Sequence, residues 1–300
     1  MTIDKKRLVE DFKAFGIRPG ELLQVCASLR SIGWVEGGAR TVVDALLEVV
    51  GEKGTLVGNA YLKAYSLPLR PEHAQLISDR LTLPYTGAVC KAMIGHPRMH
   101  RSGHPINRYV AIGAQARELM EGHTPESYAY DVQRIMAERG ACCLRIGPRR
   151  MFVGAGTSHA SQWLAGLKQK PRPLGINYRD KNGDIKLMRV DWPSGCARGF
   201  RNFIPLYEAR GAIRASGGKT GEAPLELFWM KKAMEIEVEK LSKDPGFCLC
   251  DNPCCKDCRL SWEFSDGTLL SVQWHLLLHR LRNHSITEWP GYLLRKLKGR

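Results

Sequence analysis

The sequence of 300 residues lacks the signals of several protein classes. Its first residues, MTIDKKRLVEDFKAFG, are charged throughout and contain no apolar segment like that of a secretory signal, and no later apolar run approaches the length of a membrane span. Neither a Walker lysine motif nor GxGxxG occurs, and no strand pattern is both basic and rich in aromatic residues, as in RNA-binding sheets. We therefore expect a cytoplasmic protein without a membrane span, for which nucleic acid is not the expected partner.

Hydrophobic residues and positive charge are both abundant. The hydrophobic content of 44% is enough for a substantial core, in one large α/β domain or in one domain with an appendage. The formal net charge of +15 favours an anionic partner, and charge alone does not choose among a phosphate-bearing cofactor, an acidic substrate, nucleic acid and an anionic membrane surface. In the cytoplasm the ten cysteines are expected to be reduced thiols or metal ligands.

The stretch from Cys26 to Gly58 is the most informative part of the chain. The apolar run LLQVCAS before it and TLVGNAY at its end are typical of strands, and between them apolar residues recur at helical spacing until Gly51 and Gly54. This order predicts a βαβ unit. Gly37 and Gly38 directly precede the helix, where free amides and the helix dipole can hold a phosphate, although such glycines often serve only as a turn.

Other segments add helices and strands. We expect helices at 5–15, 114–120 and 132–139, strands at 109–113 and 141–147, and a buried amphipathic helix at 269–282. Together with the βαβ unit they predict an α/β fold, with a mixed or mostly parallel central sheet flanked by helices. Residues 62–84 follow neither period and are interpreted as a loop or lid that carries substrate contacts.

A second glycine-rich turn precedes a histidine at the expected start of a helix. Gly154 and Gly156 are followed by Thr157, Ser158 and His159, and then by the run ASQWLAG. The helix dipole tends to keep a histidine at this position neutral, as acid–base catalysis near pH 7 requires. A purely structural histidine remains the alternative from the residues alone.

Three blocks of the chain resemble the aminoglycoside 3-N-acetyltransferase family. The segment SLRSIGWVEGGARTVVDALLEVVGEKGTLV is similar to the family's opening signature, RSGHPINRYVAIGAQA to its second block, and GTSHASQW to its third. TGEAPLELF is a weaker match to a fourth block. The blocks occur in the family's order, between residue 20 and about residue 235.

The resemblance implies acetyl transfer from acetyl-CoA to a small-molecule amine. It implies that His159 is the general base, which takes a proton from the amine as the amine attacks the thioester. It further implies that Thr157 and Ser158 help to hold the thioester oxygen or CoA, and that Cys26 need not be a nucleophile. The other residues that it assigns to acetyl-CoA lie in the first block: Ser28, Leu29, Ser31, Val35, Gly37 and Gly38.

Departures from the family's pattern concern the acceptor. Gln162 stands before Trp163 where the family has a glutamate, and DWPSGCARGFRNF contains Arg198 and Arg201 in a region that tends to be acidic in aminoglycoside-modifying members. Because an aminoglycoside is a polycation, its binding favours carboxylates. We therefore expect an anionic or neutral amine as acceptor. The expected acceptor contacts are His104, Gln162, Arg198 and Arg201.

The segment CLCDNPCCKDC concentrates cysteines near the C-terminus. Thiolates at such spacings on a turn-rich segment can bind zinc tetrahedrally, and an iron–sulfur cluster is a less favoured occupant. Two interpretations stay open for residues 241–300, a structural zinc site and five reduced cysteines without a metal. This segment is predicted to pack with its helix on the acetyltransferase-like α/β domain of residues 1–240. The basic tail GYLLRKLKGR is expected to be solvated. The candidate ligands are Cys248, Cys250, Cys254, Cys255 and Cys258.

Two functions follow from these observations. The first is an acetyl-CoA-dependent N-acetyltransferase, and the alternative is a catalytically weak relative that binds CoA or a partner. The acid that orients His159 is left open among Asp180, Asp184 and Glu208. The oligomeric state is not determined by the sequence.

Overall fold

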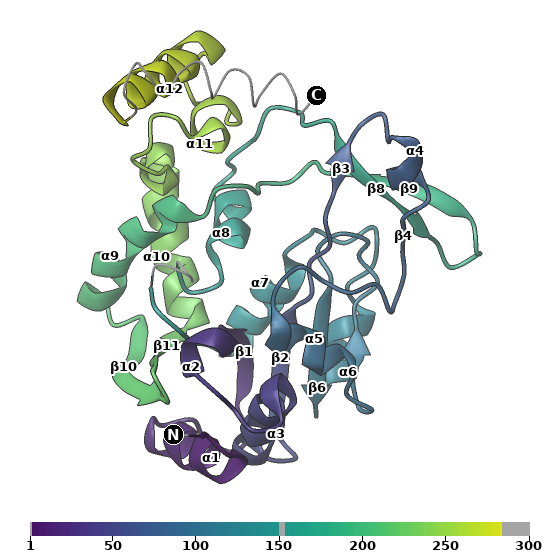
Figure 1. The fold of residues 1–300 in the computed structure, drawn as a ribbon, viewed down its shortest axis with the longest axis vertical. Coiled ribbons are helices and arrows are strands. Elements are labelled where there is room, and N and C mark those ends of the chain that lie inside the picture. Colours follow the sequence, from purple (N-terminus) through teal and green to yellow (C-terminus); the bar gives the residue numbers. More distant parts are fainter. Residues whose placement is uncertain (1, 150–153, 284–300) are drawn as a thin grey trace.

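A mixed sheet of seven strands forms the centre of the molecule, which the computed structural model describes for residues 2–149 and 154–283 (Figure 1). Strand β1 pairs in parallel with β2 and β7, and all other pairs in this sheet are antiparallel. The predicted α/β fold with a mixed central sheet is confirmed. In spatial order the strands are β10 (Ile213–Thr220), β11 (Ala223–Trp229), β7 (Cys142–Ile146), β1 (Leu22–Ala27), β2 (Thr55–Asn59), β6 (Tyr109–Gly113) and β5 (His100–Arg101).

The predicted βαβ unit is confirmed as β1, α3 (Gly38–Val50) and β2. A short helix, α2 (Leu29–Ile32), lies between β1 and the glycine turn. Helix α3 buries its apolar face at the spacing seen in the sequence, and it ends at Gly51, whose φ of 64° suits a residue without a Cβ atom. The unit therefore positions the N-terminus of α3 at the end of the sheet where β1 ends.

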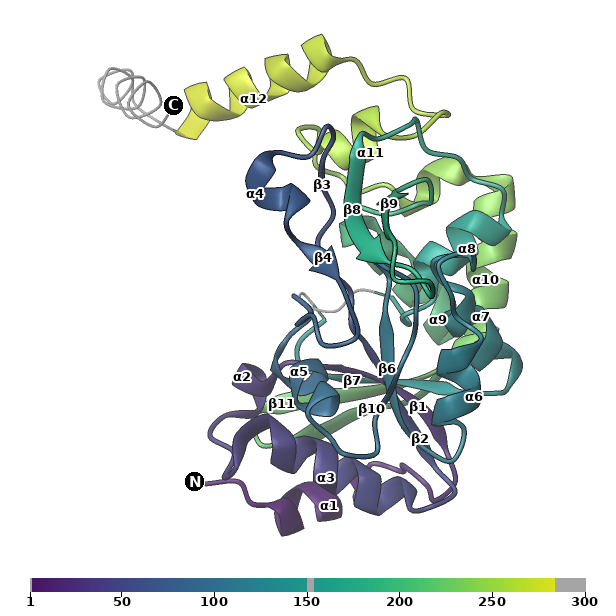
Figure 2. The same cartoon turned by 90° about the vertical axis from the view of Figure 1, so that its right-hand side faces the viewer.

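Helices cover both faces of the central sheet (Figure 2). Helices α1 (Lys5–Ala14), α3 and α5 (Ala88–Ile94) share one apolar core with β1, β2 and β7. The opposite core holds α6 (Ala116–Glu121), α7 (Asp131–Glu138), α8 (Ser158–Leu164), α9 (Ile204–Ala209) and α10 (Met230–Lys243). The sheet is thus the middle layer of three, and α8 lies on the side opposite to α3.

A second sheet lies beside the first and is built around β8 (Leu174–Arg179). Its partners are β3 (Tyr65–Ser66), β4 (Ile77–Ser78) and β9 (Ile185–Arg189), and α4 (Pro71–Ala74) connects β3 to β4. Residues 62–84 therefore are not the single loop that we predicted. Their two short strands pair with a strand about a hundred residues later in the chain, a partner that local periodicity cannot reveal.

The C-terminal part contains η1 (Arg198–Phe203), η2 (Pro245–Cys248), α11 (Lys256–Leu260) and α12 (Leu269–Asn283). Its cysteine-rich segment packs on the remainder through a bridge between Gln169 and Trp262. The boundary expected at residue 240 falls inside α10.

The burial predicted for 269–282 is wrong, since α12 extends away from the body and Leu270 and Trp274 are exposed. Its apolar pattern predicts a helix correctly, but it does not show whether another element covers that helix. The tail of residues 291–300 lies outside the described residues. Within the described residues no helix is both long and apolar enough to cross a membrane.

Candidate active site

His159 lies in the first turn of α8, directly after the glycine turn. Its ring stacks on Tyr130 with the centroids 5.3 Å apart, and it meets the edge of Phe200 at 4.9 Å. These rings come from three separate segments of the chain. They hold the imidazole in one orientation.

A chain of hydrogen bonds fixes the tautomer of His159. The amide nitrogen of Gln162 donates to Cys248 Sγ at 3.3 Å, and the Cys248 thiol donates to the Pro245 carbonyl. The amide oxygen of Gln162 therefore faces His159 Nδ1 at 2.8 Å. Because this oxygen can only accept, Nδ1 carries the proton and Nε2 keeps the lone pair that a general base needs.

Burial lowers the pKa of His159 to about 4, an effect larger than the rise caused by its hydrogen bond to the Gln162 oxygen, and the charge of Arg172 lowers the pKa further. The imidazole is therefore neutral at pH 7. Asp180, Asp184 and Glu208 were the open candidates for an orienting acid. The hydrogen-bond partner is instead the neutral Gln162, while Asp180 pairs with Lys186 and Glu208 with Arg149.

A cavity of about 350 Å³ adjoins His159. Its lining comes from segments far apart in the sequence, and it includes part of the region expected as a lid. Among the lining residues that the structure describes, Lys63 is the one with a permanent charge, and none carries a carboxylate. The lining residues are Tyr61, Leu62, Lys63, Ala64, Tyr85, Ile106, Asn107, Tyr130, His159, Leu174, Val190, Trp192, Ser194 and Gly195.

The hydroxyl groups of Thr157 and Ser158 are engaged within the protein. Both hydroxyls donate to the buried carboxylate of Glu237 on α10, as do those of Ser161 and Tyr207. Because these donors are already used, the contact of Thr157 and Ser158 with CoA or the thioester oxygen, which stays a prediction, requires other polar atoms of the two residues. Glu237, which sequence reasoning missed, ties the first turn of α8 to α10.

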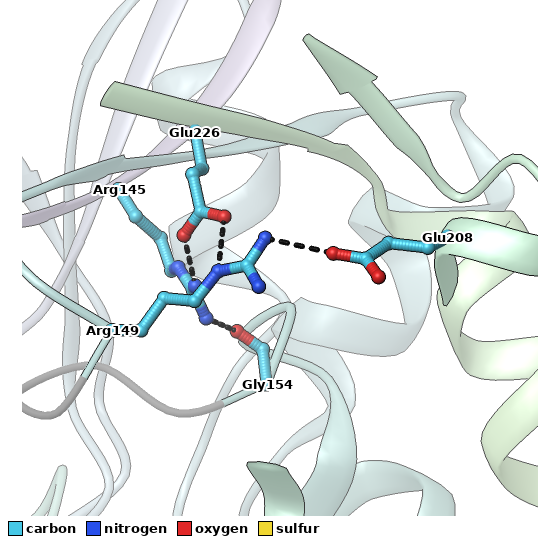
Figure 3. Close-up of polar contacts among 5 residues, drawn as sticks. All are labelled: Arg145, Arg149, Gly154, Glu208 and Glu226. Carbon is cyan, nitrogen blue, oxygen red and sulfur yellow. Dashed lines mark hydrogen bonds and ion pairs between the residues drawn. The ribbon is translucent and has the colours of Figure 1, made fainter. Parts of the chain in front are cut away.

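Arg145 also anchors the glycine turn to the central sheet (Figure 3). Arg145 on β7 is 1% exposed, donates to the Gly154 carbonyl and forms an ion pair with Glu226 on β11. Arg149 binds the second oxygen of Glu226 at 2.7 Å and Glu208 at 3.0 Å. Sequence reasoning missed this network as well. It connects two strands of the sheet to the turn that leads into α8.

The first block forms the end of β1, α2 and the start of α3. Ser28 caps α2 and accepts a hydrogen bond from the Ser31 hydroxyl at 2.8 Å, while Val35 is buried. Gly37 is the N-cap of α3 and has no side chain to cap this helix, while the amide of Gly38 donates to the Val35 carbonyl at 3.0 Å. The N-terminus of a 13-residue helix without a side chain at its N-cap is a position at which proteins bind anions.

All four expected acceptor contacts lie outside the described lining of the cavity. His104 is buried, stacks on His123, and its Nδ1 accepts hydrogen bonds from the amides of Ile106 and Asn107, so it stabilises a turn. Arg198 and Arg201 are exposed on η1, and Arg201 pairs with Asp251 at 2.7 Å. Gln162, the fourth, contacts His159 as described above.

The expected set of metal ligands needs correction. Four sulfurs lie within 4.8 Å of one another, those of Cys196, Cys250, Cys255 and Cys258. Cys248 and Cys254 are not members of this group. The sulfur of Cys248 instead interacts with Gln162 and Pro245. Cys196, distant in sequence, was missed because no local spacing links it to the other three.

Residues 25–242 match the family model described as aminoglycoside 3-N-acetyltransferase. The chain belongs to the aminoglycoside 3-N-acetyltransferase family. Its relatives include the aminoglycoside N(3)-acetyltransferase III of Serratia marcescens, which is 35% identical over 274 residues, 80% of this chain and 97% of that protein. The family predicted from the three sequence blocks is confirmed.

Solved structures share the fold of this family member. A mutant of aminoglycoside acetyltransferase AAC(3)-IVa in complex with gentamicin has a TM-score of 0.71 and 22% identity, over 86% of this chain and 96% of that chain. AAC-IIIb in a binary complex with CoASH has a TM-score of 0.65 and 21% identity, over 81% and 97% of the two chains. At this identity the likeness establishes the fold alone.

Proposed function

We propose that the protein transfers an acetyl group from acetyl-CoA to an anionic or neutral amine, with His159 as general base. The amine nitrogen attacks the thioester carbonyl carbon, its proton passes to Nε2 of His159, and the carbon–sulfur bond breaks to release CoA. A protonated amine has no lone pair, so the step requires a neutral base beside it.

One observation carries this proposal. His159 lines a cavity in a single tautomer, with Nδ1 engaged by Gln162 and Nε2 left as the lone-pair nitrogen. Its lowered pKa keeps it neutral at pH 7. A neutral histidine that lines a cavity has the protonation state and the position that a general base requires.

Acetyl-CoA is the proposed donor for two reasons. A related structure, AAC-IIIb, contains CoASH, and the uncapped start of α3 in this chain offers amides to an anion. Ser28 and Ser31 bind each other at the end of β1 and shape the adjoining turn. In this proposal the cofactor lies against the backbone at the start of α2 and of α3, which is formed by Leu29, Gly37 and Gly38.

The charge of the cavity supports an anionic or neutral acceptor. The lining residues include Lys63 and no carboxylate, and Arg172 is close enough to His159 and Tyr130 to lower the pKa of the imidazole. The chain as a whole has a net charge of +15. A polycationic aminoglycoside would meet repulsion here instead of the carboxylates that would bind it.

Competing amines test the acceptor charge. We expect a carboxylate- or phosphate-bearing amino sugar to be acetylated with a higher kcat/KM than kanamycin. Lys63→Glu should shift this ratio about tenfold towards the cation, which corresponds to about 1.4 kcal/mol. Lys53→Glu is the matched control, because Lys53 is exposed in the turn between α3 and β2, and it should leave the ratio of the two kcat/KM values unchanged. Faster turnover of kanamycin by the wild type would refute the anionic acceptor.

The alternative is a catalytically weak relative that binds CoA or a partner. Gln162 favours it, because a neutral amide does not stabilise the imidazolium as a glutamate would. Release of CoA thiol across a broad panel of amines separates the two functions. If no amine causes release while CoA still binds, the alternative is supported and the acetyltransferase is rejected.

A further inference from the structure

Four cysteines from two distant segments meet beside the candidate active site. The sulfurs of Cys196, Cys250, Cys255 and Cys258 all lie within 4.8 Å of one another, and Cys250 and Cys258 are buried. Around a tetrahedral zinc ion, sulfurs at about 2.3 Å from the metal are about 3.8 Å apart. The four thiols therefore need to move by less than about 1 Å to coordinate one ion.

The short distances among the four sulfurs favour a single metal ion over an iron–sulfur cluster. An iron–sulfur cluster inserts several iron and sulfide atoms among its cysteines and spreads them apart, whereas a single ion draws all four together. A tetrahedral set of four thiolates is typical of structural zinc, and zinc binds such divalent-ion sites more tightly than Fe²⁺. The backbone amide of Cys250 also donates to Cys258 Sγ at 3.4 Å, the kind of hydrogen bond that stabilises a ligand thiolate.

Other contacts beside the cysteines join the segment that follows Cys196 to the cysteine-rich segment. A Cβ atom on Gly199 would lie 2.1 Å from the Cys248 carbonyl oxygen, so glycine is required for this approach. Arg201 pairs with Asp251 at 2.7 Å, and the Asn202 side chain donates to the Phe247 carbonyl at 2.8 Å. These contacts bring the thiols together in the folded chain, as a metal site requires.

We propose that Cys196, Cys250, Cys255 and Cys258 bind one zinc ion, which fixes the cavity wall beside His159. Ser194 and Gly195, directly before Cys196, line the cavity. Phe200, four residues after Cys196, contacts the His159 ring. The ion joins this wall to the cysteine-rich segment, so its role is to hold the acceptor side of the site in place.

Metal analysis of the full chain, purified without a metal-affinity tag, tests the ligand set. We expect about one zinc per wild-type chain and a loss of at least about fivefold in Cys196→Ser and Cys255→Ser. Cys254→Ser is the matched control, since Cys254 neighbours Cys255 but lies outside the cluster, and it should keep its zinc. Less than a tenth of an equivalent in the wild type, iron in place of zinc, or equal loss in Cys254→Ser would overturn the proposal.

Cobalt provides a second measurement on the wild-type chain, independent of how the variants fold. Replacement of zinc by Co²⁺ should produce thiolate-to-metal charge-transfer absorption and the intense visible bands of tetrahedral coordination. Weak bands typical of six oxygen or nitrogen ligands would contradict the four-cysteine site.

Amide hydrogen exchange tests the role of the ion. On zinc removal from the wild type we expect faster exchange in residues 192–203, with the strands of the central sheet unaffected. Unchanged exchange in 192–203 after complete zinc removal would reject the positioning role. Neither the metal content nor the exchange depends on acetyl transfer, so a failure here is distinct from a failure of the proposed function.

Discussion

Gln162 determines how His159 can act, because it holds Nδ1 with a neutral oxygen. Where the family's pattern has a glutamate, this chain has an amide whose nitrogen is itself held by Cys248. A carboxylate next to the imidazole would favour the charged ring and raise its pKa. With the amide, burial dominates and the pKa of His159 falls to about 4. Burial therefore keeps the imidazole neutral, and Gln162 is a positioning residue that fixes its tautomer without adding a negative charge.

Replacement of Gln162 by glutamate tests this role. We expect Gln162→Glu to raise the pKa of His159 by about one to three units, because the new carboxylate stabilises the imidazolium. The pH titration of the His159 ring proton in NMR spectra, assigned by its loss in His159→Gln, measures this shift. In the wild type the ring should stay neutral until the pH approaches 4. A Gln162→Glu titration that coincides with the wild-type titration would show that Gln162 does not control the protonation.

At the residue scale, the sequence was informative where a motif was local. His159 and Gln162 could be located because they lie in one short block. The sequence carried a weaker indication that Glu237 is buried. Glu237 lies four residues after Ala233 and four before Leu241, and all three are buried on one face of α10. A glutamate on such an apolar face predicts a buried carboxylate. Its four hydroxyl partners come from α8, the preceding turn and α9, which the spacing cannot identify.

At the scale of elements, the start of α8 depends on two anchors. Glu237 binds three hydroxyl groups of the turn and of α8, and Arg145 on β7 holds the Gly154 carbonyl. Both anchors are buried charged groups. Loss of one member of a buried ion pair leaves the other charge unpaired, which costs more than loss of an exposed pair.

Arg145 and Arg149 both pair with Glu226, and replacing each in turn compares how much a buried and an exposed ion pair contribute to stability. Arg145→Met should lower the free energy of unfolding by about 3–5 kcal/mol, because Glu226 and the Gly154 carbonyl lose a buried partner. Arg149→Met, a half-exposed partner of the same carboxylate, should cost less than about 1 kcal/mol. Urea unfolding of both variants measures these losses. Equal losses would contradict a special role for the buried pair.

Strands and helices were predictable where apolar periodicity was strong. The unit of β1, α3 and β2 follows directly from its sequence, because its contacts are local. Residues 62–84 were not predictable, since β3 and β4 gain their strand character only by pairing with β8. For α12 the apolar periodicity correctly predicted a helix, but the predicted burial was wrong, because periodicity does not show whether another element covers the helix.

At the scale of the whole molecule, distant segments create the site. The cavity is lined by residues from 61 to 195, the thiol cluster joins Cys196 to residues 250–258, and α10 supplies the anchor for α8. Only the parts carried by single blocks, the histidine and the glycine turn before α3, could be predicted from sequence. The positive net charge predicts an anionic partner, and this stays a prediction that the competition between amines tests.

The central claim is that neutral His159 is the base for acetyl transfer, and His159→Gln tests it most directly. The variant should lower kcat by about 10²- to 10⁴-fold, because general-base catalysis contributes this much. CoA affinity, measured by calorimetry on the same protein, should stay within about twofold, since the proposed pyrophosphate site lies at α3. A kcat within a few-fold of the wild type would contradict the account.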